Sequence, residues 1–100
     1  MKKTIYKYPI TDENKQVILL PKEAEILSVQ VQNGTPCIWV LVNPEEEPEP
    51  RHFEIFGTGN PFPVDVGSDR RFIGTFQENG FVWHLFERII NIMNANTIIN

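Results

Sequence analysis

Two Asn-Gly pairs, each lying between two apolar runs, constrain the fold of this chain more than any other feature. Asn33-Gly34 lies within residues 28–42, and Asn79-Gly80 lies within residues 72–86. Asn-Gly supplies the positive-φ residues of a type I′ turn, whose twist matches that of paired strands. Both segments are therefore predicted to form antiparallel β-hairpins.

The other apolar segments are short and alternate with polar residues, which is typical of strands buried on one face. Residues 4–8 stop at Pro9 and are expected to form an edge strand, because proline cannot donate to a sheet ladder. Residues 37–42 are apolar on both faces, which predicts a central strand or a contact between subunits. The pattern predicts an all-β fold, a small antiparallel sandwich or partly open barrel of about seven strands. The candidate strands are residues 4–8, 16–20, 26–32, 35–42, 51–56, 72–77 and 80–87.

Three segments lack a strand pattern. Residues 44–50 hold four glutamates and three prolines and are predicted to be an exposed loop that cannot pair in a sheet. Residues 57–69 form a long loop, and long ordered loops often carry binding residues. The chain is expected to be one β domain over residues 1–87, followed by an Ile- and Asn-rich extension over residues 88–100. This extension is predicted to be a short helix or arm that packs on the domain or on a second subunit.

Composition limits the classes of partner. The chain has 100 residues, 41% of them hydrophobic, so it can build one thin core, and pairing between copies would add stability. A net charge of −4 argues against nucleic acid as a partner, although a few local arginines can still hold a small anion. No apolar run approaches the ~20 residues of a membrane span, and the start lacks the apolar stretch of a signal peptide. We therefore expect a cytoplasmic homo-oligomer.

The residues that carry catalytic chemistry are few. His52 and His84 are far apart and lack the spacing of metal ligands, so neither a metal nor another cofactor is expected. Cys37 lies in the most apolar strand, where a buried thiol packs as a small hydrophobic residue. Glu54 shares a strand face with His52, a spacing that suits a surface ion pair as well as hydrolysis. An enzyme is therefore not expected.

An anion site is suggested by three arginines and a glycine-rich loop. Arg70 and Arg71 are adjacent, so in a strand they point to opposite faces, and one of them can clamp a phosphate. Residues 57–60, Gly-Thr-Gly-Asn, can aim backbone N–H groups at an anion or can simply form a turn that needs a flexible φ. Arg51 begins the strand that leads into this loop. His84 is expected to be half-buried and hydrogen-bonded, or to donate to a ligand.

Four segments carry a resemblance to a known group of proteins: residues 28–39, 56–61, 73–77 and 81–87. Over residues 5–87 the chain resembles a family of small phage and prophage proteins, whereas the tail after Glu87 departs from its shorter members. In character it is similar to phage sponges that sequester the nucleotide signals of bacterial immune systems such as Thoeris and CBASS. The resemblance implies a non-catalytic pocket, at a subunit interface, for a cyclic ADP-ribose-like molecule or a cyclic dinucleotide.

The leading hypothesis is therefore a phage-encoded anti-defence protein in the host cytoplasm that sequesters a small nucleotide signal. The alternative is an adaptor or inhibitor that binds a host protein through the apolar strand and the acidic loop. A third hypothesis, a phosphodiesterase, has no credible set of acid, base and metal ligand. In the leading hypothesis arginines bind phosphate, the Gly-Thr-Gly-Asn loop binds phosphate or ribose, and two glutamines bind polar edges. The candidate ligand-binding residues are Arg51, Thr58, Gly59, Asn60, Arg70, Arg71, His84, Gln30 and Gln32.

Overall fold

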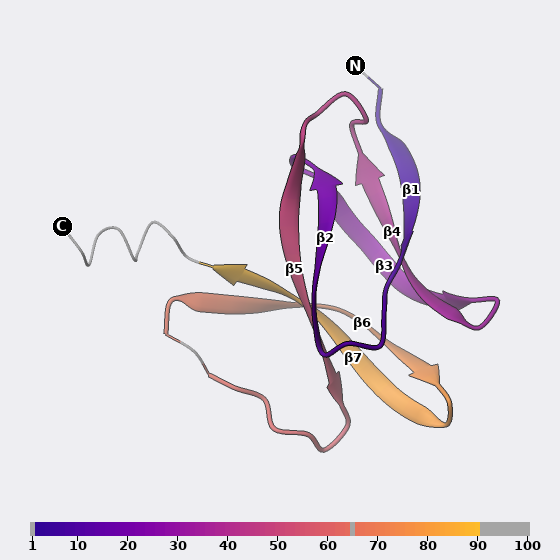
Figure 1. Cartoon of the computed structure of the whole chain (residues 1–100), viewed down its shortest axis with the longest axis vertical. Helices are drawn as coiled ribbons and strands as arrows, with labels where there is room; N and C mark the ends of the chain where they lie inside the picture. The colour runs from indigo at the N-terminus through magenta and orange to yellow at the C-terminus, as the bar shows by residue number, and fades with distance from the viewer. Residues whose placement is uncertain (1, 65, 91–100) are drawn as a thin grey trace.

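Seven strands build two antiparallel sheets in the computed structural model, which describes residues 2–64 and 66–90 (Figure 1). One sheet has the strand order β1-β4-β3 and the other the order β2-β5-β7-β6. The predicted all-β fold is confirmed, and it is sandwich-like rather than a closed barrel. The strands are β1 (Thr4–Pro9), β2 (Lys15–Pro21), β3 (Glu25–Gln32), β4 (Thr35–Val42), β5 (Pro48–Gly57), β6 (Ser68–Glu78) and β7 (Phe81–Ile90).

Both predicted hairpins are confirmed. Asn33 and Gly34 have φ angles of 51° and 80°, and Asn79 and Gly80 have φ angles of 54° and 79°. These are the paired positive values of a type I′ turn. The first turn joins β3 to β4, and the second joins β6 to β7.

The three-stranded sheet is organised around β4. Its inward residues Ile38, Val40 and Val42 are at most 1% exposed. On the outer face Cys37 is buried, while Trp39 and Leu41 are half-buried. Because β4 lies between β1 and β3, the prediction of a central strand is confirmed, as is the edge position of β1.

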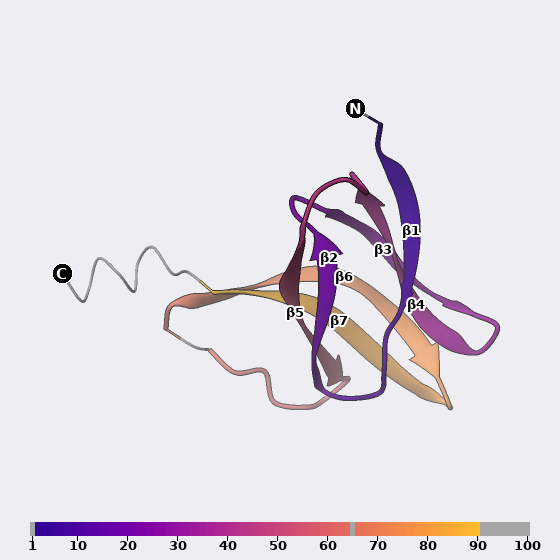
Figure 2. The same cartoon turned by 45° about the horizontal axis from the view of Figure 1, so that its top comes forward.

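The four-stranded sheet is held together by β5. This strand pairs with β2 from Pro48 to Glu54 and with β7 from His52 to Gly57, so the two partners overlap along three residues only. In Figures 1 and 2 the β6–β7 hairpin runs crosswise to β1 and β2. The sheet therefore turns at the middle of β5.

The hydrophobic core lies between the inner faces of the two sheets. Its centre is made by Phe53, Leu20, Ile38 and Leu85, all at most 1% exposed. The sheets come closest where β3 crosses β6. A Cβ atom placed on Gly74 of β6 would lie 2.7 Å from Cγ1 of Val29 in β3, and real Cβ atoms do not approach so closely. Glycine at this position therefore allows the two sheets to meet.

The prediction that residues 44–50 form an unpaired loop is wrong for the second half of that segment. Residues 48–50 belong to β5 and pair with residues 19–21 of β2. This part of β5 has a neighbouring strand on one side only. A strand with an open side tolerates proline, because a missing N–H on that side breaks no ladder hydrogen bond.

The boundaries of the last segments also differ from the sequence pattern. The long loop is shorter than predicted, because β6 begins at Ser68. Strand β7 reaches Ile90 and so includes residues 88–90 of the predicted extension. The predicted helix or arm over residues 91–100 lies outside the described residues. Within residues 2–64 and 66–90 there is no helix of the length and hydropathy needed to cross a membrane.

Replacing Gly74 with alanine is expected to lower the free energy of unfolding by about 1–3 kcal/mol, because the added methyl group overlaps Val29. Chemical denaturation followed by circular dichroism measures this change. Gly74→Ala in a Val29→Ala background is the control, because the clashing methyl group is then gone. The double variant should lose less stability than the sum of the two single variants. Additive losses would contradict the proposed clash.

Candidate functional site

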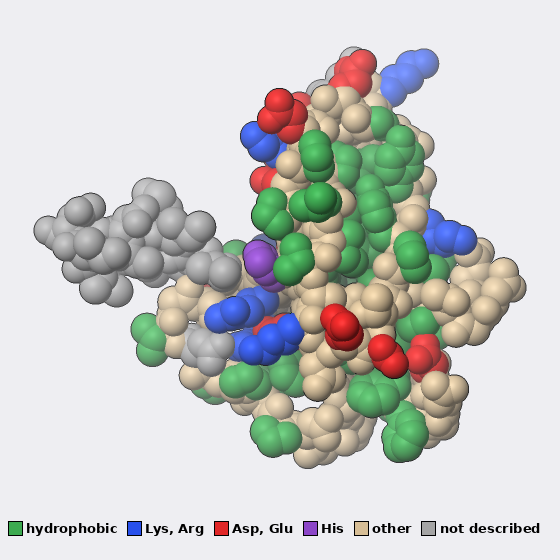
Figure 3. Space-filling view, in the orientation of Figure 1, with side chains coloured by type: hydrophobic (Ala, Val, Ile, Leu, Met, Phe, Trp, Pro, Cys, Tyr) green, Lys and Arg blue, Asp and Glu red, His purple; other side chains and the backbone are tan. Residues whose placement is uncertain are grey.

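The strands β5 and β7 separate at one point and leave an opening between them. Their last paired residues are His52 and Arg88, after which β7 continues against β6 alone. The opening is a cleft of about 470 Å³, which we call the fork cleft. Figure 3 shows Lys and Arg side chains gathered beside a histidine on the face that this view presents. The fork cleft is lined by Glu49, Pro50, Arg51, His52, Arg71, Glu87, Arg88 and Ile89.

Arg51 is held by a buried carboxylate at the back of the fork cleft. Its Nε and Nη2 atoms donate to the two carboxylate oxygens of Glu87, with 3.0 Å between Nη2 and Oε1. Its Nη1 donates to the carbonyl oxygen of Ala24 at 2.9 Å. Glu87 is only 4% exposed, and its hydrogen bond to Arg51 raises the pKa of the guanidinium more than burial lowers it. Arg51 therefore joins β5, β7 and the β2–β3 turn.

Arg70 is held in a similar way on the opposite face of the same sheet. Its Nε donates to Oε1 of Glu54 at 2.7 Å, and each of these side chains is 5% exposed. Its Nη1 donates to the carbonyl oxygen of Pro63 at 3.1 Å, and its guanidinium carbon lies 5.5 Å from the centre of the Phe62 ring. The ring of Phe62 in turn packs against Phe56 in a tilted arrangement and against Phe86 edge-on. The loop between β5 and β6 thus covers a buried ion pair.

Arg71 differs from both of these arginines. It lies opposite Glu87 in the β6–β7 register, on the face that carries Arg51. Its side chain is exposed and forms no hydrogen bond or ion pair with any residue that the structure describes. It lines the fork cleft and a second hollow of about 330 Å³ beside residues 24–27. Arg71 therefore has donor groups available for a ligand.

His84 is fixed between two threonines on adjacent elements. Its Nε2 lies 2.8 Å from Oγ1 of Thr58, and its Nδ1 lies 2.9 Å from Oγ1 of Thr75. Both ring nitrogens are therefore occupied, which is the half-buried, hydrogen-bonded arrangement that the sequence offered as one alternative. Within the described residues no group of three or more His, Cys, Asp and Glu side chains could hold a metal ion.

The Gly-Thr-Gly-Asn segment forms a tight turn. The amide of Asn60 donates to the carbonyl oxygen of Gly57 at 3.0 Å, and Gly59 has a φ of 87°. That φ is typical of glycine at the third position of a turn. Gln30 and Gln32 lie on β3 in the other sheet, where Gln32 accepts a hydrogen bond from Lys7. Of the nine candidate residues, Arg51 and Arg71 line the fork cleft together, whereas Thr58 and His84 contact each other outside it.

The sequence pattern does not predict the two glutamates that bind these arginines. Glu54 and Glu87 each lie in an apolar, aromatic stretch of sequence, where a carboxylate is buried only with a partner. That context was the available signal. A glutamate in such a stretch indicates that a cationic side chain lies close to it in the fold. The sequence does not show which cation this is, because the partner arginines are 16 and 36 residues away along the chain.

Replacing Glu87 with glutamine is expected to lower the free energy of unfolding by about 3 kcal/mol, because it leaves the Arg51 guanidinium without its counter-charge in a buried site. Urea denaturation at neutral pH measures the loss. Glu45→Gln is the matched control, since Glu45 is exposed in the turn before β5 and makes no ion pair with any residue that the structure describes. Equal stability of the two variants would contradict a structural role for the Arg51–Glu87 pair.

Comparison with known proteins identifies a family. No curated protein matches the chain significantly, and no solved structure does. A family model described as a domain of unknown function, DUF7352, matches residues 1–94. This match spans all seven strands and both walls of the fork cleft. The chain therefore belongs to the DUF7352 family.

Proposed function

We propose that this protein is a non-catalytic binding protein that holds the phosphate group of a small anionic ligand in the fork cleft. Three arginines and two glutamates line the cleft, so its Arg and Glu side chains sum to one net positive charge. The whole chain carries a net charge of −4. A local excess of guanidinium groups in an acidic chain favours one anionic group over a long polyanion.

The availability of Arg71 carries this proposal. The Arg51–Glu87 pair forms a rigid, nearly neutral wall, and Arg71 stands beside it with unused donors. A guanidinium can donate two parallel hydrogen bonds to phosphate oxygens. The walls of the fork cleft therefore supply positive charge and N–H donors, and both favour the binding of a phosphate group.

The class of ligand follows from the size and lining of the fork cleft. A volume of about 470 Å³ lies in the range of small-molecule sites. A signalling nucleotide, which the resemblance implies, supplies the phosphate that the arginines recognise. The lining contains no Phe, Tyr or Trp ring on which a base would stack, so we assign affinity to the phosphate rather than to the base. The proposed setting is the cytoplasm of a host cell.

Replacing Arg71 with alanine is expected to weaken binding of a phosphate ligand at least about tenfold, because charge-assisted hydrogen bonds are lost. Isothermal titration with pyrophosphate, cyclic dinucleotides and cyclic ADP-ribose-like molecules measures the affinity. Arg71→Lys should bind with intermediate affinity, since it keeps the charge but not the planar fork. Lys7→Ala, which removes a cation from the other sheet, should bind normally.

A second measurement distinguishes sequestration from hydrolysis. The loaded protein is heated and the released ligand is identified by mass spectrometry. A sequestering protein returns the ligand unchanged, whereas a phosphodiesterase returns a product. The proposal fails if none of these phosphates binds the folded chain, or if the Arg71→Ala and Lys7→Ala variants bind equally well.

We also propose that the protein is a homo-oligomer joined along β2. This strand is an edge of its sheet, and Val17 and Leu19 on its outer face are 57% and 61% exposed. An antiparallel pair of β2 strands centred on Ile18 would place each Val17 opposite Leu19 of the second copy, with no like charges facing each other. Such a pair would continue the sheet across two subunits.

Replacing Leu19 with glutamate is expected to shift this oligomer to the monomer, because the two strands would then bring carboxylates into the apolar contact. Sedimentation velocity over a range of concentrations measures the change. Leu27→Glu is the control, since Leu27 is an exposed leucine of the other sheet. A wild-type chain that stays monomeric at high concentration would exclude the β2 contact.

The alternative function, an adaptor that acts through its apolar strand, has less support from the fold. The apolar strand is β4, and it has β1 and β3 on its two sides, so it offers no free edge to a partner. A pull-down from host lysate separates the hypotheses, because an adaptor recovers a stoichiometric protein and a sequestering protein recovers a small molecule.

A further inference from the structure

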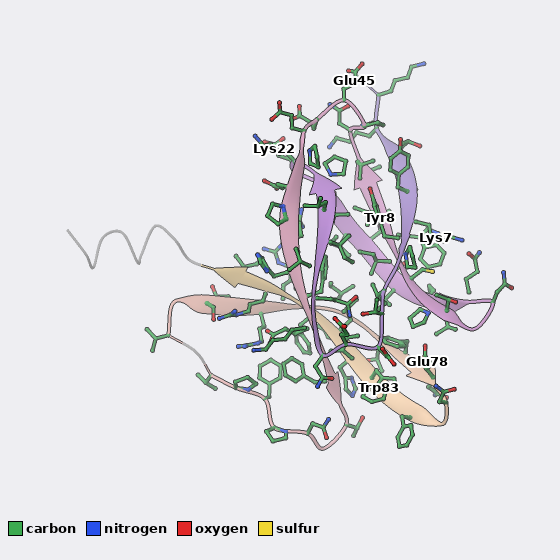
Figure 4. The ribbon with its side chains drawn as sticks, viewed as in Figure 1. Lys7, Tyr8, Lys22, Glu45, Glu78 and Trp83 are labelled. Atoms are coloured by element: carbon green, nitrogen blue, oxygen red, sulfur yellow. The ribbon has the colours of Figure 1, made fainter. Side chains whose placement is uncertain are left out.

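A third cavity lies at the start of β7, whereas the fork cleft lies at the end of that strand. It has a volume of about 270 Å³ and lies between the β1–β2 connection and the tip of the β6–β7 hairpin. Figure 4 shows two of its residues, Glu78 and Trp83, on that hairpin. We call it the aromatic hollow, and its lining residues are Thr11, Asp12, Pro36, Ile55, Phe76, Glu78, Asn79, Phe81 and Trp83.

The interior of the aromatic hollow is apolar. Ile55 and Phe76 are 6% and 7% exposed, and Trp83 is half-buried. Phe81 is 64% exposed, and its ring centre lies 6.0 Å from that of Trp83 with 50° between the ring planes. Aromatic rings at the mouth of an apolar cavity suit an organic cation, which is attracted to a ring face within about 6 Å.

Two carboxylates make the mouth of the aromatic hollow negative. Asp12 is exposed, Glu78 is half-buried, and the lining includes no lysine, arginine or histidine. Within residues 2–64 and 66–90 neither side chain forms an ion pair or a hydrogen bond. A half-buried carboxylate is poorly screened by water, so a positive charge placed beside it is strongly favoured. The charge of this cavity is therefore opposite to that of the fork cleft.

We propose that the aromatic hollow binds a small organic cation, an amine or guanidinium group attached to an apolar body. The apolar body would contact Ile55 and Phe76, and the cationic group would lie between the ring of Trp83 and the carboxylate of Glu78. The carboxylates repel an anion, and they give no advantage to a neutral apolar molecule. This inference does not depend on the phosphate site, because it uses different residues and the opposite charge.

Three probes with the same ring and different charges test the proposal on the full chain at pH 7. Benzylamine is a cation, benzyl alcohol is neutral and benzoate is an anion. Tryptophan fluorescence is expected to show benzylamine binding at least about fivefold more tightly than benzyl alcohol, with no measurable binding of benzoate. The benzylamine affinity should fall as salt is added. Equal binding of benzylamine and benzyl alcohol would overturn the proposal.

The two tryptophans provide a matched pair of variants. Trp39 lies on the outer face of β4 in the other sheet, so Trp39→Phe should keep the fluorescence change. Trp83→Phe should lose it. If Trp83→Phe does not fold, the Trp39→Phe variant alone still tests the site. Loss of the fluorescence change in Trp39→Phe would place the ligand near Trp39 and would overturn the proposal.

Charge variants of the exposed mouth test the role of the carboxylates by calorimetry. Glu78→Gln and Asp12→Asn should each weaken benzylamine binding at least about threefold. Glu45→Gln removes the same charge at the far end of the molecule, as Figure 4 shows, and should leave the affinity unchanged. Equal weakening in all three variants would indicate general attraction to an acidic protein and would overturn the site.

The cation can be a free small molecule or the side chain of a peptide. Titration with free amines and with short lysine- or arginine-containing peptides compares these sources. Tighter binding of a peptide would assign the aromatic hollow to a basic side chain of a protein partner. Tighter binding of a free amine would assign it to a metabolite. Failure of both classes at millimolar concentration would overturn the site.

Discussion

The bidentate pair of Arg51 and Glu87 is the interaction on which the four-stranded sheet depends. Backbone pairing between β5 and β7 ends at His52 and Arg88, and the ion pair lies beside this point. The third bond of Arg51, to the carbonyl of Ala24, joins the β2–β3 turn to the same place. The Arg51–Glu87 ion pair thus continues the connection between β5 and β7 where the ladder of backbone hydrogen bonds stops. Burial makes the pair costly to break from either side.

A second ion pair on the other face of this sheet has a different role. Glu54 and Arg70 lie under Phe62 and Pro63, so they fix the long loop against the outer face. Two of the three arginines that suggested an anion site are therefore used to hold the sheet and its loop. This use leaves Arg71 as the arginine with donors available to a ligand, which favours the fork cleft over the glycine-rich turn as the proposed site.

The sequence was sufficient for features that depend on local geometry. The two Asn-Gly turns define their hairpins because the required φ angles belong to adjacent residues, and the alternation of β4 defines a strand enclosed on both faces. The strand at residues 48–50 could not be predicted from the sequence. Composition indicates the propensity of a segment to form a strand, but it does not say whether that strand has a neighbouring strand on one side or on both.

The position of Arg71 opposite Glu87 in the strand register could not be predicted from the sequence, for a related reason. Continuing the register from the Asn79-Gly80 turn would place Arg71 opposite Arg88, but an irregularity between Phe72 and Gly74 shifts it by one residue. A one-residue shift moves every following side chain to the other face. The glycine beside this bulge marks its position, yet only contact with β3 explains why it is needed.

The strand order has a consequence for how the chain folds during its synthesis. The first two strands to be made, β1 and β2, pair with β4 and β5, which are made later. The β3–β4 and β6–β7 hairpins have local partners and can form as soon as their turns are complete. The N-terminal strands therefore have no native partner on the ribosome until residues 37–42 of β4 and 48–54 of β5 emerge. Val17 and Leu19 are exposed to other nascent chains throughout that interval, which makes β2 the segment most open to premature association.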